Sequence, residues 1–498
     1  MEQGRCVLPA LRHSVDSHTV PEPERDPYEL SPVEIELPPP TLALALRRIG
    51  PGLILAGSIV GTGELIATTN TGAKAGFTLL WLVLLSCFIK VFVQIELGRH
   101  SVSSGQTTLM AFRSLRAPGT LLTWWWVVML LVTQTQMGAM VGGLGQAFHM
   151  AFPGAAPWMA SLAGGESTAS GRWLSVHPEM PWAAFVAVAT STVLALGSYR
   201  AVERGTTVMV ALFTLMTLGC VALLPAVGGA ITSADLLSGL QFRLPEVEGA
   251  MVVAFAMFGI TGVGASELIA YPYWCIEKGY ARYVGPRDDS AAWAERGRGW
   301  MRVMYADAWV SMLVYTVATV AFYILGAAVL HGRTEAKGLP GNVQDMMKTL
   351  THMYEPVLGL VGAHWFLLLG VFAVLYSTLF ASTAASCRTL VDFLHVNQLV
   401  ELQKPGRRAR LTRLFCVIFP LLDFGIYSLM GNLTRMVQVG GFVQALTLPM
   451  IATAAIVLRY RRTDRRLTSG PLWDFFLWLS VLGLYVAAVY GVWDSVLR

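Results

Sequence analysis

Eleven apolar stretches, each close to membrane length, constrain the fold of this chain more than any other feature. A bilayer core of ~30 Å is crossed by about 20 apolar residues in a helix. Hydrophobic residues make up 54% of the 498 residues and charged residues only 13%, which is too apolar for a soluble protein of this length. The sequence therefore predicts an all-α polytopic membrane protein. The predicted spans lie near residues 50–71, 77–97, 120–150, 182–199, 206–228, 247–275, 305–330, 359–386, 412–430, 436–458 and 472–494.

Lysine and arginine gather in every second connection between the predicted spans, beginning with Arg47 and Arg48 before the first span. Because cytoplasmic loops carry an excess of these residues, we expect a cytoplasmic amino terminus. With an odd number of spans the carboxyl terminus lies outside, as do the loops at about 152–181 and 331–358, and we expect the protein in the cell membrane. The net charge of +5 reflects this topology, so no nucleic-acid partner is predicted.

Residues 1–45 differ in composition from the rest of the chain. They are polar and Pro-rich, with the run Pro38-Pro39-Pro40, and they contain no apolar core of a signal peptide. We expect them to form a disordered cytoplasmic tail, and residues 46–498 to form the transmembrane domain.

Several classes of function are disfavoured by what the sequence lacks. The six cysteines show no Cys-x-x-Cys spacing and the nine histidines no His-x-x-x-His pair, so neither a disulfide framework nor a zinc site is indicated. There is no Gly-x-x-x-x-Gly-Lys motif for a nucleotide phosphate. No nucleophile and base occur at usable spacing. An ATP-driven pump is therefore not expected, nor an enzyme or a cofactor.

The sequence Glu-Leu-Ile-Ala occurs twice, at 64–67 and 267–270, each time after a glycine-rich break inside an apolar span. A carboxylate within a membrane span is functional by default, and glycine weakens a helix. The copies lie on spans one and six, so five spans separate them and the second copy is inverted. This predicts two inverted five-helix repeats, at about 46–230 and 246–458, each opening with a broken helix, plus an extra helix at about 472–494. Sites of transporters with this plan lie at the midplane between the breaks.

Further stretches, in their order along the chain, resemble the Nramp (natural resistance-associated macrophage protein) family of metal-ion transporters from about Gly50 to Leu479. That resemblance implies a LeuT-like fold of two inverted five-helix repeats plus one extra helix, eleven spans in all. The matching stretches are Gly50-Pro51-Gly52-Leu53, residues 72–81, residues 94–105, residues 199–204, Tyr354-Glu355-Pro356, Ser377-Thr378 and Phe393-Leu394.

This chain departs from the family at the metal site itself. The family carries Asp-Pro-Gly-Asn in its first broken helix, where this chain has Gly61, Thr62, Gly63 and Glu64. It carries Met-Pro-His-Asn in the sixth helix, where the best alignment gives Gly264, Ala265, Ser266 and Glu267. The acidic residues usual on the third helix are absent, and the polar groups there are Gln134, Gln136 and Gln146.

Two glutamates on opposite half-helices supply hard oxygen ligands, while the soft sulfur of the family is missing. Oxygen ligands favour Mg²⁺ or Mn²⁺ over thiophilic metals. We expect a secondary transporter of a divalent cation that works by alternating access, with Glu64 and Glu267 as metal ligands. The other residues expected to line the substrate site are Gly61, Thr62, Gly262, Gly264, Ser266 and Gln136.

Other interpretations stay open at this stage. A roomier site also suits an organic cation or an amino compound, and a non-transporting sensor or scaffold is a further alternative. Ion or proton coupling would involve Glu64, Glu267, Ser377 and Thr378, whereas uniport needs no such group. The glutamates could instead be permanently protonated or paired with a buried base. Lys90 and Arg388 are the candidates for such a base. Thr62, Ser266 and Asp307 could serve as helix caps, and the hydroxyl side chains could form contacts between helices. Of Gln134 and Gln136, we expect only one to face the cavity.

Overall fold

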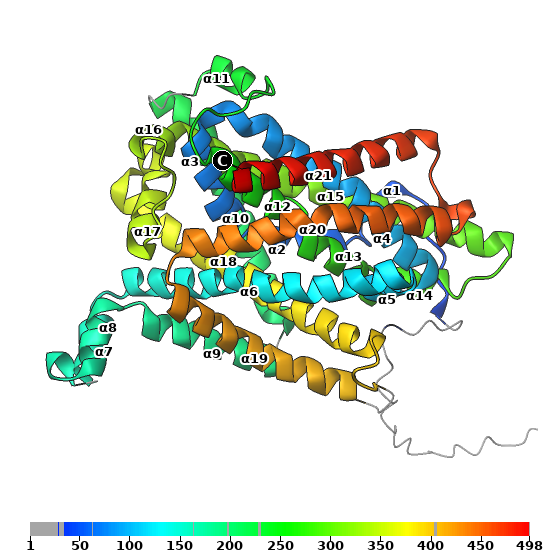
Figure 1. Ribbon diagram of the computed structural model, residues 1–498, viewed down its shortest axis with the longest axis horizontal. Coiled ribbons are helices and arrows are strands. Elements are labelled where there is room, and N and C mark those ends of the chain that lie inside the picture. Colours follow the sequence, from blue (N-terminus) through cyan, green and yellow to red (C-terminus); the bar gives the residue numbers. More distant parts are fainter. Residues whose placement is uncertain are drawn as a thin grey trace, which may run out of the picture.

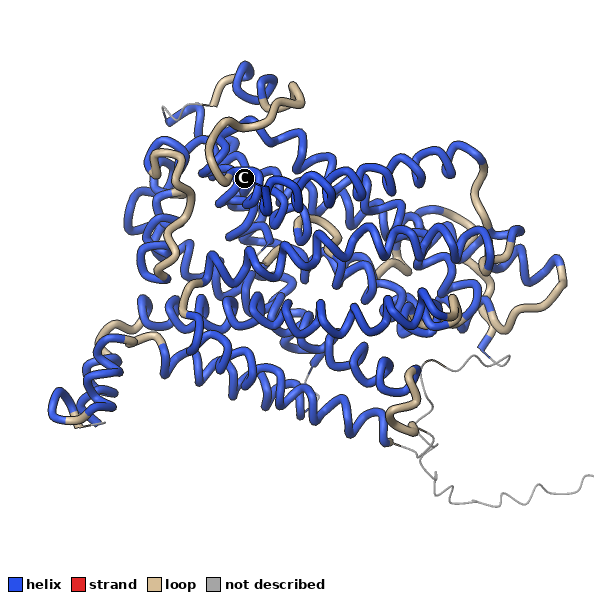
Figure 2. The backbone as a smooth tube through the Cα atoms, in the orientation of Figure 1, coloured by secondary structure: helices blue, strands red, loops and turns tan. Residues whose placement is uncertain are grey.

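A computed structural model of the protein describes Tyr28 and residues 34–61, 63–162, 164–196, 199–227, 231–402 and 406–497. Over these residues the chain is helical and contains no strand (Figure 2). The first half comprises α1 Leu42–Leu46, α2 Pro51–Ile59, the π-helix η2 Gly63–Thr68, α3 Thr69–Ala75, η3 Gly76–Leu79, α4 Leu80–Ser104, α5 Thr108–Arg113, α6 Ala117–Ala151, α7 Ala155–Leu162, η4 Gly165–Ser167, α8 Ala169–Val176, α9 Met180–Leu196, α10 Tyr199–Leu223, η5 Leu224–Val227 and α11 Ser233–Ser238. The second half comprises α12 Ala250–Ile260, α13 Ala265–Glu277, α14 Tyr280–Val284, α15 Ala291–Leu325, the π-helix η6 Gly326–Leu330, α16 His331–Arg333, α17 Val343–His352, α18 Glu355–Val396, α19 Arg407–Met430, α20 Leu433–Arg461, η7 Arg465–Leu467 and α21 Pro471–Leu497.

The short elements between the long helices gather at the two ends of the molecule (Figure 1). One end, on the left of the view, carries α7, α8, α16 and α17, which belong to the two loops that the sequence places together outside. The opposite end carries α1, α5 and α14, which belong to the basic connections. Helix α21 ends on the side of α16, away from α1. This sorting of loops agrees with the alternation of basic connections in the sequence.

The described helices differ from the predicted eleven spans in two respects. Nine of them are long and apolar enough to cross a membrane, or ten if the pair α8 and α9, bent by 86°, forms one span. The predicted first span is not one helix, because α2 ends at Ile59 and helical structure resumes at Gly63 and runs on to Ser104. The nine residues of α2 are too few to cross a bilayer alone. The rest of the first predicted span and the whole second span form one continuous helical run after the break.

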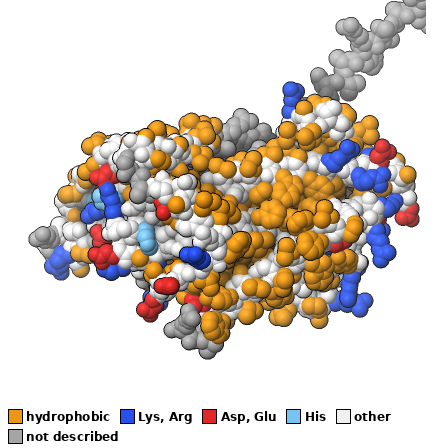
Figure 3. Space-filling model, turned by 90° about the horizontal axis from the view of Figure 1, so that it is seen from above, with side chains coloured by type: hydrophobic (Ala, Val, Ile, Leu, Met, Phe, Trp, Pro, Cys, Tyr) orange, Lys and Arg blue, Asp and Glu red, His pale blue; other side chains and the backbone are white. Residues whose placement is uncertain are grey.

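A hydrophobic band covers the middle of the face seen in Figure 3, whereas charged side chains lie towards the ends. The most apolar window of residues 250–277 is 83% buried inside the protein, against 28% for residues 208–227 and for 407–430. The broken helix formed by α12 and α13 is therefore central, and α10 and α19 are peripheral and face lipid.

Part of the predicted tail is packed rather than free. Residues 1–27 and 29–33 lie outside the described residues, but Tyr28 donates from its hydroxyl to Glu277 Oε1 at 2.9 Å. The backbone N–H of Glu36 donates to the Tyr283 carbonyl at 3.1 Å, and Glu36 pairs with Arg48. The described part of residues 1–45 is thus held against α13 and α14, because the Tyr28 hydroxyl and the Glu36 backbone find partners there. Composition alone does not reveal such partners.

Asp307 of α15 caps the start of α2, as the capping alternative expects. Its side chain is fully buried and accepts from the backbone N–H groups of Gly50 at 2.8 Å and Gly52 at 2.6 Å. The Tyr271 hydroxyl of α13 also donates to Asp307 Oδ2, at 3.0 Å. One carboxylate therefore joins the first half of broken helix one to α13 and α15.

We expect Asp307→Ala to lower the free energy of unfolding by roughly 1–3 kcal/mol, because it leaves buried donors without an acceptor. Thermal unfolding of the detergent-solubilised protein measures the effect. Asp289→Ala, at an exposed position just before α15, serves as the control and should change little. An unfolding temperature of Asp307→Ala equal to that of the control would contradict the capping role.

Candidate functional site

The first break lies between α2 and η2 and is fixed by contact with α18. Val60 leaves the helical region with φ −68° and ψ 80°, and its carbonyl accepts from the Thr378 hydroxyl at 3.4 Å. A Cβ atom on Gly61 would overlap the Thr378 side chain. Glycine is therefore required here by the close approach of α18, and the break is built into the packing.

Glu64 lies behind this break and is fully buried. Its Oε2 accepts from the Gly61 N–H at 3.3 Å, and its Oε1 accepts from the Thr319 hydroxyl of α15 at 3.1 Å. Both carboxylate oxygens thus have protein partners. Glu64 closes the first turn after the break, in the way that an acidic residue stabilises a helix amino terminus.

The second break separates α12 from α13. Thr261 is extended, with φ −72° and ψ 137°, and Gly262 adopts φ +64° beside Cys87 and Tyr315. A residue with a Cβ atom rarely adopts such a backbone conformation. The glycine therefore allows the backbone to leave the helical conformation between the end of α12 and the start of α13 at Ala265.

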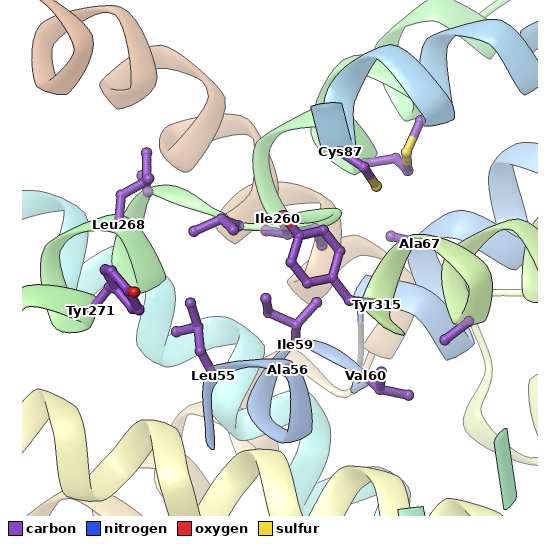
Figure 4. Close-up of a cluster of buried hydrophobic side chains, with 14 of the residues drawn as sticks. Leu55, Ala56, Ile59, Val60, Ala67, Cys87, Ile260, Leu268, Tyr271 and Tyr315 are labelled. Carbon is purple, nitrogen blue, oxygen red and sulfur yellow. The ribbon is translucent and has the colours of Figure 1, made fainter. Parts of the chain in front are cut away.

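The two breaks lie side by side. The Thr68 and Thr261 hydroxyls are 3.2 Å apart and share a hydrogen bond. An added Cβ on Gly63 would lie 3.4 Å from the Ile260 carbonyl oxygen. Figure 4 shows the Tyr315 side chain between Ile260 of one break and Val60 of the other. The central juxtaposition that the repeated sequence predicts is therefore present in the structure.

A cavity opens beside the breaks, between α2, α6, α13, α18 and α20. Its walls are rich in aromatic and sulfur-containing side chains, and Glu267 is the one ionisable side chain among the described residues that line it. It extends towards Trp126, near the start of α6, and Thr389, near the end of α18, which is the end of the molecule with the basic connections. The polar lining residues are Thr133, Gln134, Gln136, Ser266, Glu267, Thr378, Ser382, Ser386, Thr389 and Gln444.

Glu267 and two glutamines converge at the start of α13. An added Cβ on Gly264 would lie 2.5 Å from Glu267 Oε2 and 2.8 Å from Gln444 Oε1. Gln444 Oε1 accepts from the Ser266 N–H at 3.1 Å, and its Nε2 donates to Gln136 Oε1 at 2.7 Å. This chain of hydrogen bonds joins α13, α20 and α6 and presents carboxylate and amide oxygens at one point.

The residues expected from the sequence divide into two groups. Gln136, Ser266, Glu267 and Thr378 line the cavity. Gly61, Glu64, Gly262 and Gly264 instead form the breaks, and Ser377 donates to the Val374 carbonyl of its own helix at 3.1 Å. Thr62 lies outside the described residues.

One expectation about the cavity is wrong, and one alternative left open by the sequence is met only in part. Both Gln134 and Gln136 line the cavity, although the sequence allows only one; Gln134 also donates to Asp423 Oδ1 of α19 at 3.1 Å. Within the described residues, neither base considered as a partner of the glutamates forms an ion pair with Glu64 or Glu267, although Lys90 interacts electrostatically with both. Arg388 instead lies 3.5 Å from Glu277, and the Lys90 ammonium donates to backbone carbonyls.

Sequence reasoning did not single out Gln444, Asp423 or Thr319, which contact the site residues. Gln444 and Asp423 interrupt strongly apolar spans, and a polar residue in such a span is a usable signal. Thr319 gives no such signal, because threonine is common in membrane helices and its bond to Glu64 joins positions 255 residues apart.

The donor set favours a hard cation held mainly through oxygen. No group of three His, Cys, Asp or Glu side chains comes together among the described residues. A cation in the cavity would meet one carboxylate, neutral amide and hydroxyl oxygens, and water. Magnesium tolerates such a set because it dehydrates reluctantly and keeps several waters.

Comparison with known proteins gives consistent results. The profile of the natural resistance-associated macrophage protein-like family matches residues 52–494. A solved structure of a mutant manganese transporter of Eremococcus coleocola superposes with a TM-score of 0.63 at 14% identity, covering 93% of this chain and 90% of the other.

Two further proteins extend the comparison. An uncharacterised protein of Pasteurella multocida is 23% identical over 466 residues, 92% of this chain and 94% of its own length. The structure of MhsT in complex with L-phenylalanine superposes with a TM-score of 0.51 at 17% identity, covering 88% of this chain and 98% of that one. The predicted all-α LeuT-like fold, with two inverted repeats and an extra helix, is confirmed.

Proposed function

The chain belongs to the natural resistance-associated macrophage protein-like family, and on that premise we propose that it moves a hard divalent cation, Mg²⁺ or Mn²⁺, across the membrane by alternating access. The observation that carries this proposal is the position of Glu267. Its carboxylate lines the cavity at the break of a central helix, next to the amide groups of Gln444 and Gln136. A charge at this depth is costly unless it serves a site, which also opposes a role as an inert scaffold.

The proposed site binds the cation through Glu267, neutral oxygens and retained water. Glu267 lies in the first turn of α13, where the positive end of the helix dipole stabilises the anion until a cation arrives. The related manganese transporter of Eremococcus coleocola supports a metal as cargo. The residues of the two breaks themselves, 60–64 and 261–267, include no Met or Cys, which favours Mg²⁺ and Mn²⁺ over thiophilic metals.

Alternating access would move the broken helices and α4 and α15 against α6, α18 and α20. The cavity lies between these two sets and extends towards the end with the basic connections. In the proposed cycle a bound cation neutralises Glu267, and the set with α2 and α13 then closes over it. Thr378, which touches the first break from α18, lies on the boundary between the two sets.

An organic cation is the second candidate, because the cavity has an apolar wall. Trp126, Trp274, Met129, Met137 and Met140 line it, and aromatic faces attract ammonium and guanidinium groups. In this interpretation Glu267 binds the charged group and the aromatic side chains contact the body of the substrate.

Calorimetric titration of the detergent-solubilised protein with Mg²⁺, Mn²⁺ and Ca²⁺, and separately with phenethylammonium and guanidinium chloride, tests the proposal. We expect saturable binding of Mg²⁺ or Mn²⁺. Binding of the organic cations without any binding of the three metals would overturn the metal assignment and favour the second candidate.

A further inference from the structure

Lys90 of α4 is a fully buried lysine at the centre of the protein. Its ammonium donates to the Phe258 carbonyl and, at 2.7 Å, to the Thr261 carbonyl. It also lies 4.7 Å from the centre of the Phe258 ring. Isolated buried lysines are rare, because an ammonium leaves water only at a large cost. Its contacts must therefore offset that cost.

These two carbonyls are the ones that the break in the helix releases. Phe258 lies in the last turn of α12, and Thr261 follows directly after its end. The carboxyl end of a helix carries a partial negative charge, and its last carbonyls have no partner inside the helix. In transporters with broken helices, such carbonyls coordinate the co-transported cation.

Lys90 also faces the acidic groups of both breaks. Glu64 and Glu267 interact electrostatically with its ammonium. Its hydrogen bonds go to the carbonyls and not to either carboxylate. The ammonium thus sits at the negative end of α12 while it offsets part of the charge of two glutamates.

We propose that Lys90 is a tethered co-cation that occupies the cation position created by the break between α12 and α13. The chain then needs no Na⁺ or K⁺ at this position, and its substrate moves without either ion. The statement about transport rests on the proposed function, whereas the occupancy of the carbonyl position by Lys90 does not.

Removal of the side chain tests the occupancy directly. Lys90→Ala leaves two carbonyls facing the space vacated by the ammonium and three methylene groups. A small cation should bind there and stabilise the folded state, because a ligand that binds only the native protein raises its stability. Lys90→Met fills the space with an apolar chain of similar length and should prevent this binding.

The measurement is the unfolding temperature of the substrate-free protein in ammonium, methylammonium, sodium, potassium or choline chloride at equal ionic strength. The wild-type protein should unfold at one temperature in all five salts. Lys90→Ala should unfold at a lower temperature in choline and recover by about 2–4 °C in ammonium or another small cation. Lys90→Met should be destabilised and not recover. Lys278→Ala removes an exposed lysine at the end of α13 and should show no salt-specific recovery.

Equal unfolding temperatures of Lys90→Ala in choline and in every small cation would overturn the proposal and leave Lys90 a purely structural residue. Specific stabilisation of the wild-type protein by Na⁺ or K⁺ would also overturn it, and this result is obtained even if Lys90→Ala does not fold. All of these measurements are made without the transported substrate, so their results do not depend on which substrate the protein moves.

Discussion

Glu267→Gln is expected to weaken divalent-cation binding by roughly 10- to 100-fold, the largest effect of any single change in the cavity. The substitution keeps the size and shape of the side chain but removes its negative charge. Interactions with a charged group contribute about 1.5–3 kcal/mol, and each 1.4 kcal/mol is about tenfold in affinity. Glu267 is the ionisable side chain that lines the cavity within the described residues, so no neighbouring carboxylate replaces it there.

Calorimetric titration with Mg²⁺ and Mn²⁺ measures this loss, with Glu335→Gln as the control. Glu335 is an exposed carboxylate paired with Lys337, and its substitution should leave the affinity unchanged. Glu64→Gln should weaken binding less than Glu267→Gln, because both oxygens of Glu64 already accept hydrogen bonds from Gly61 and Thr319. Unchanged affinity in Glu267→Gln would contradict the placement of the cation beside α13.

Gly61→Ala is expected to abolish transport and to lower the stability of the protein. The new methyl group would overlap the Thr378 side chain of α18, and overpacking of a well-packed interior typically costs about 1–3 kcal/mol. The overlap lies between a broken helix and α18. In alternating access these two surfaces have to separate and pack together again, so the overlap should block transport. Ion flux into proteoliposomes and the unfolding temperature measure the two consequences.

The double variant Gly61→Ala/Thr378→Ala tests the physical cause of that loss. Thr378→Ala removes the hydroxyl and methyl groups that the new Cβ would strike, so the double variant should recover part of the stability lost by Gly61→Ala. The interaction free energy from such a cycle isolates the contact between the two residues. Strictly additive effects of the two substitutions would mean that Gly61→Ala acts elsewhere. The matched control, Gly57→Ala on α2, adds a Cβ where nothing lies within 4 Å and should be well tolerated.

The broken helices could be predicted because their signal is local. Glycines at 61, 63, 262 and 264 stand beside Glu64 and Glu267 in spans that are otherwise apolar, and the order of spans gives the inverted repeat. The continuous helical run from Gly63 was harder to predict, because η2, α3, η3 and α4 follow one another without a loop between them.

The different roles of the two glutamates could not be predicted from the Glu-Leu-Ile-Ala sequence that they share. Glu64 is enclosed because Thr319 approaches from α15, whereas Glu267 faces the cavity beside Gln444 from α20. Both partners come from distant segments, and their positions depend on how the helices pack. The partners of Lys90 could not be predicted either. Its charge suggests an ion pair, but in the structure its ammonium donates to carbonyl groups at the end of α12.

Uptake of Mg²⁺ and Mn²⁺ into proteoliposomes is the most direct test of the central claim that a transported divalent cation binds beside Glu267. Vesicles containing the wild-type protein, Glu267→Gln or Glu335→Gln would be compared at equal protein content, with a divalent-sensitive dye trapped inside. We predict saturable uptake by the wild-type protein and by Glu335→Gln, and none above protein-free vesicles by Glu267→Gln. Equal uptake by wild type and Glu267→Gln, or no uptake of either metal by the wild-type protein, would contradict the account.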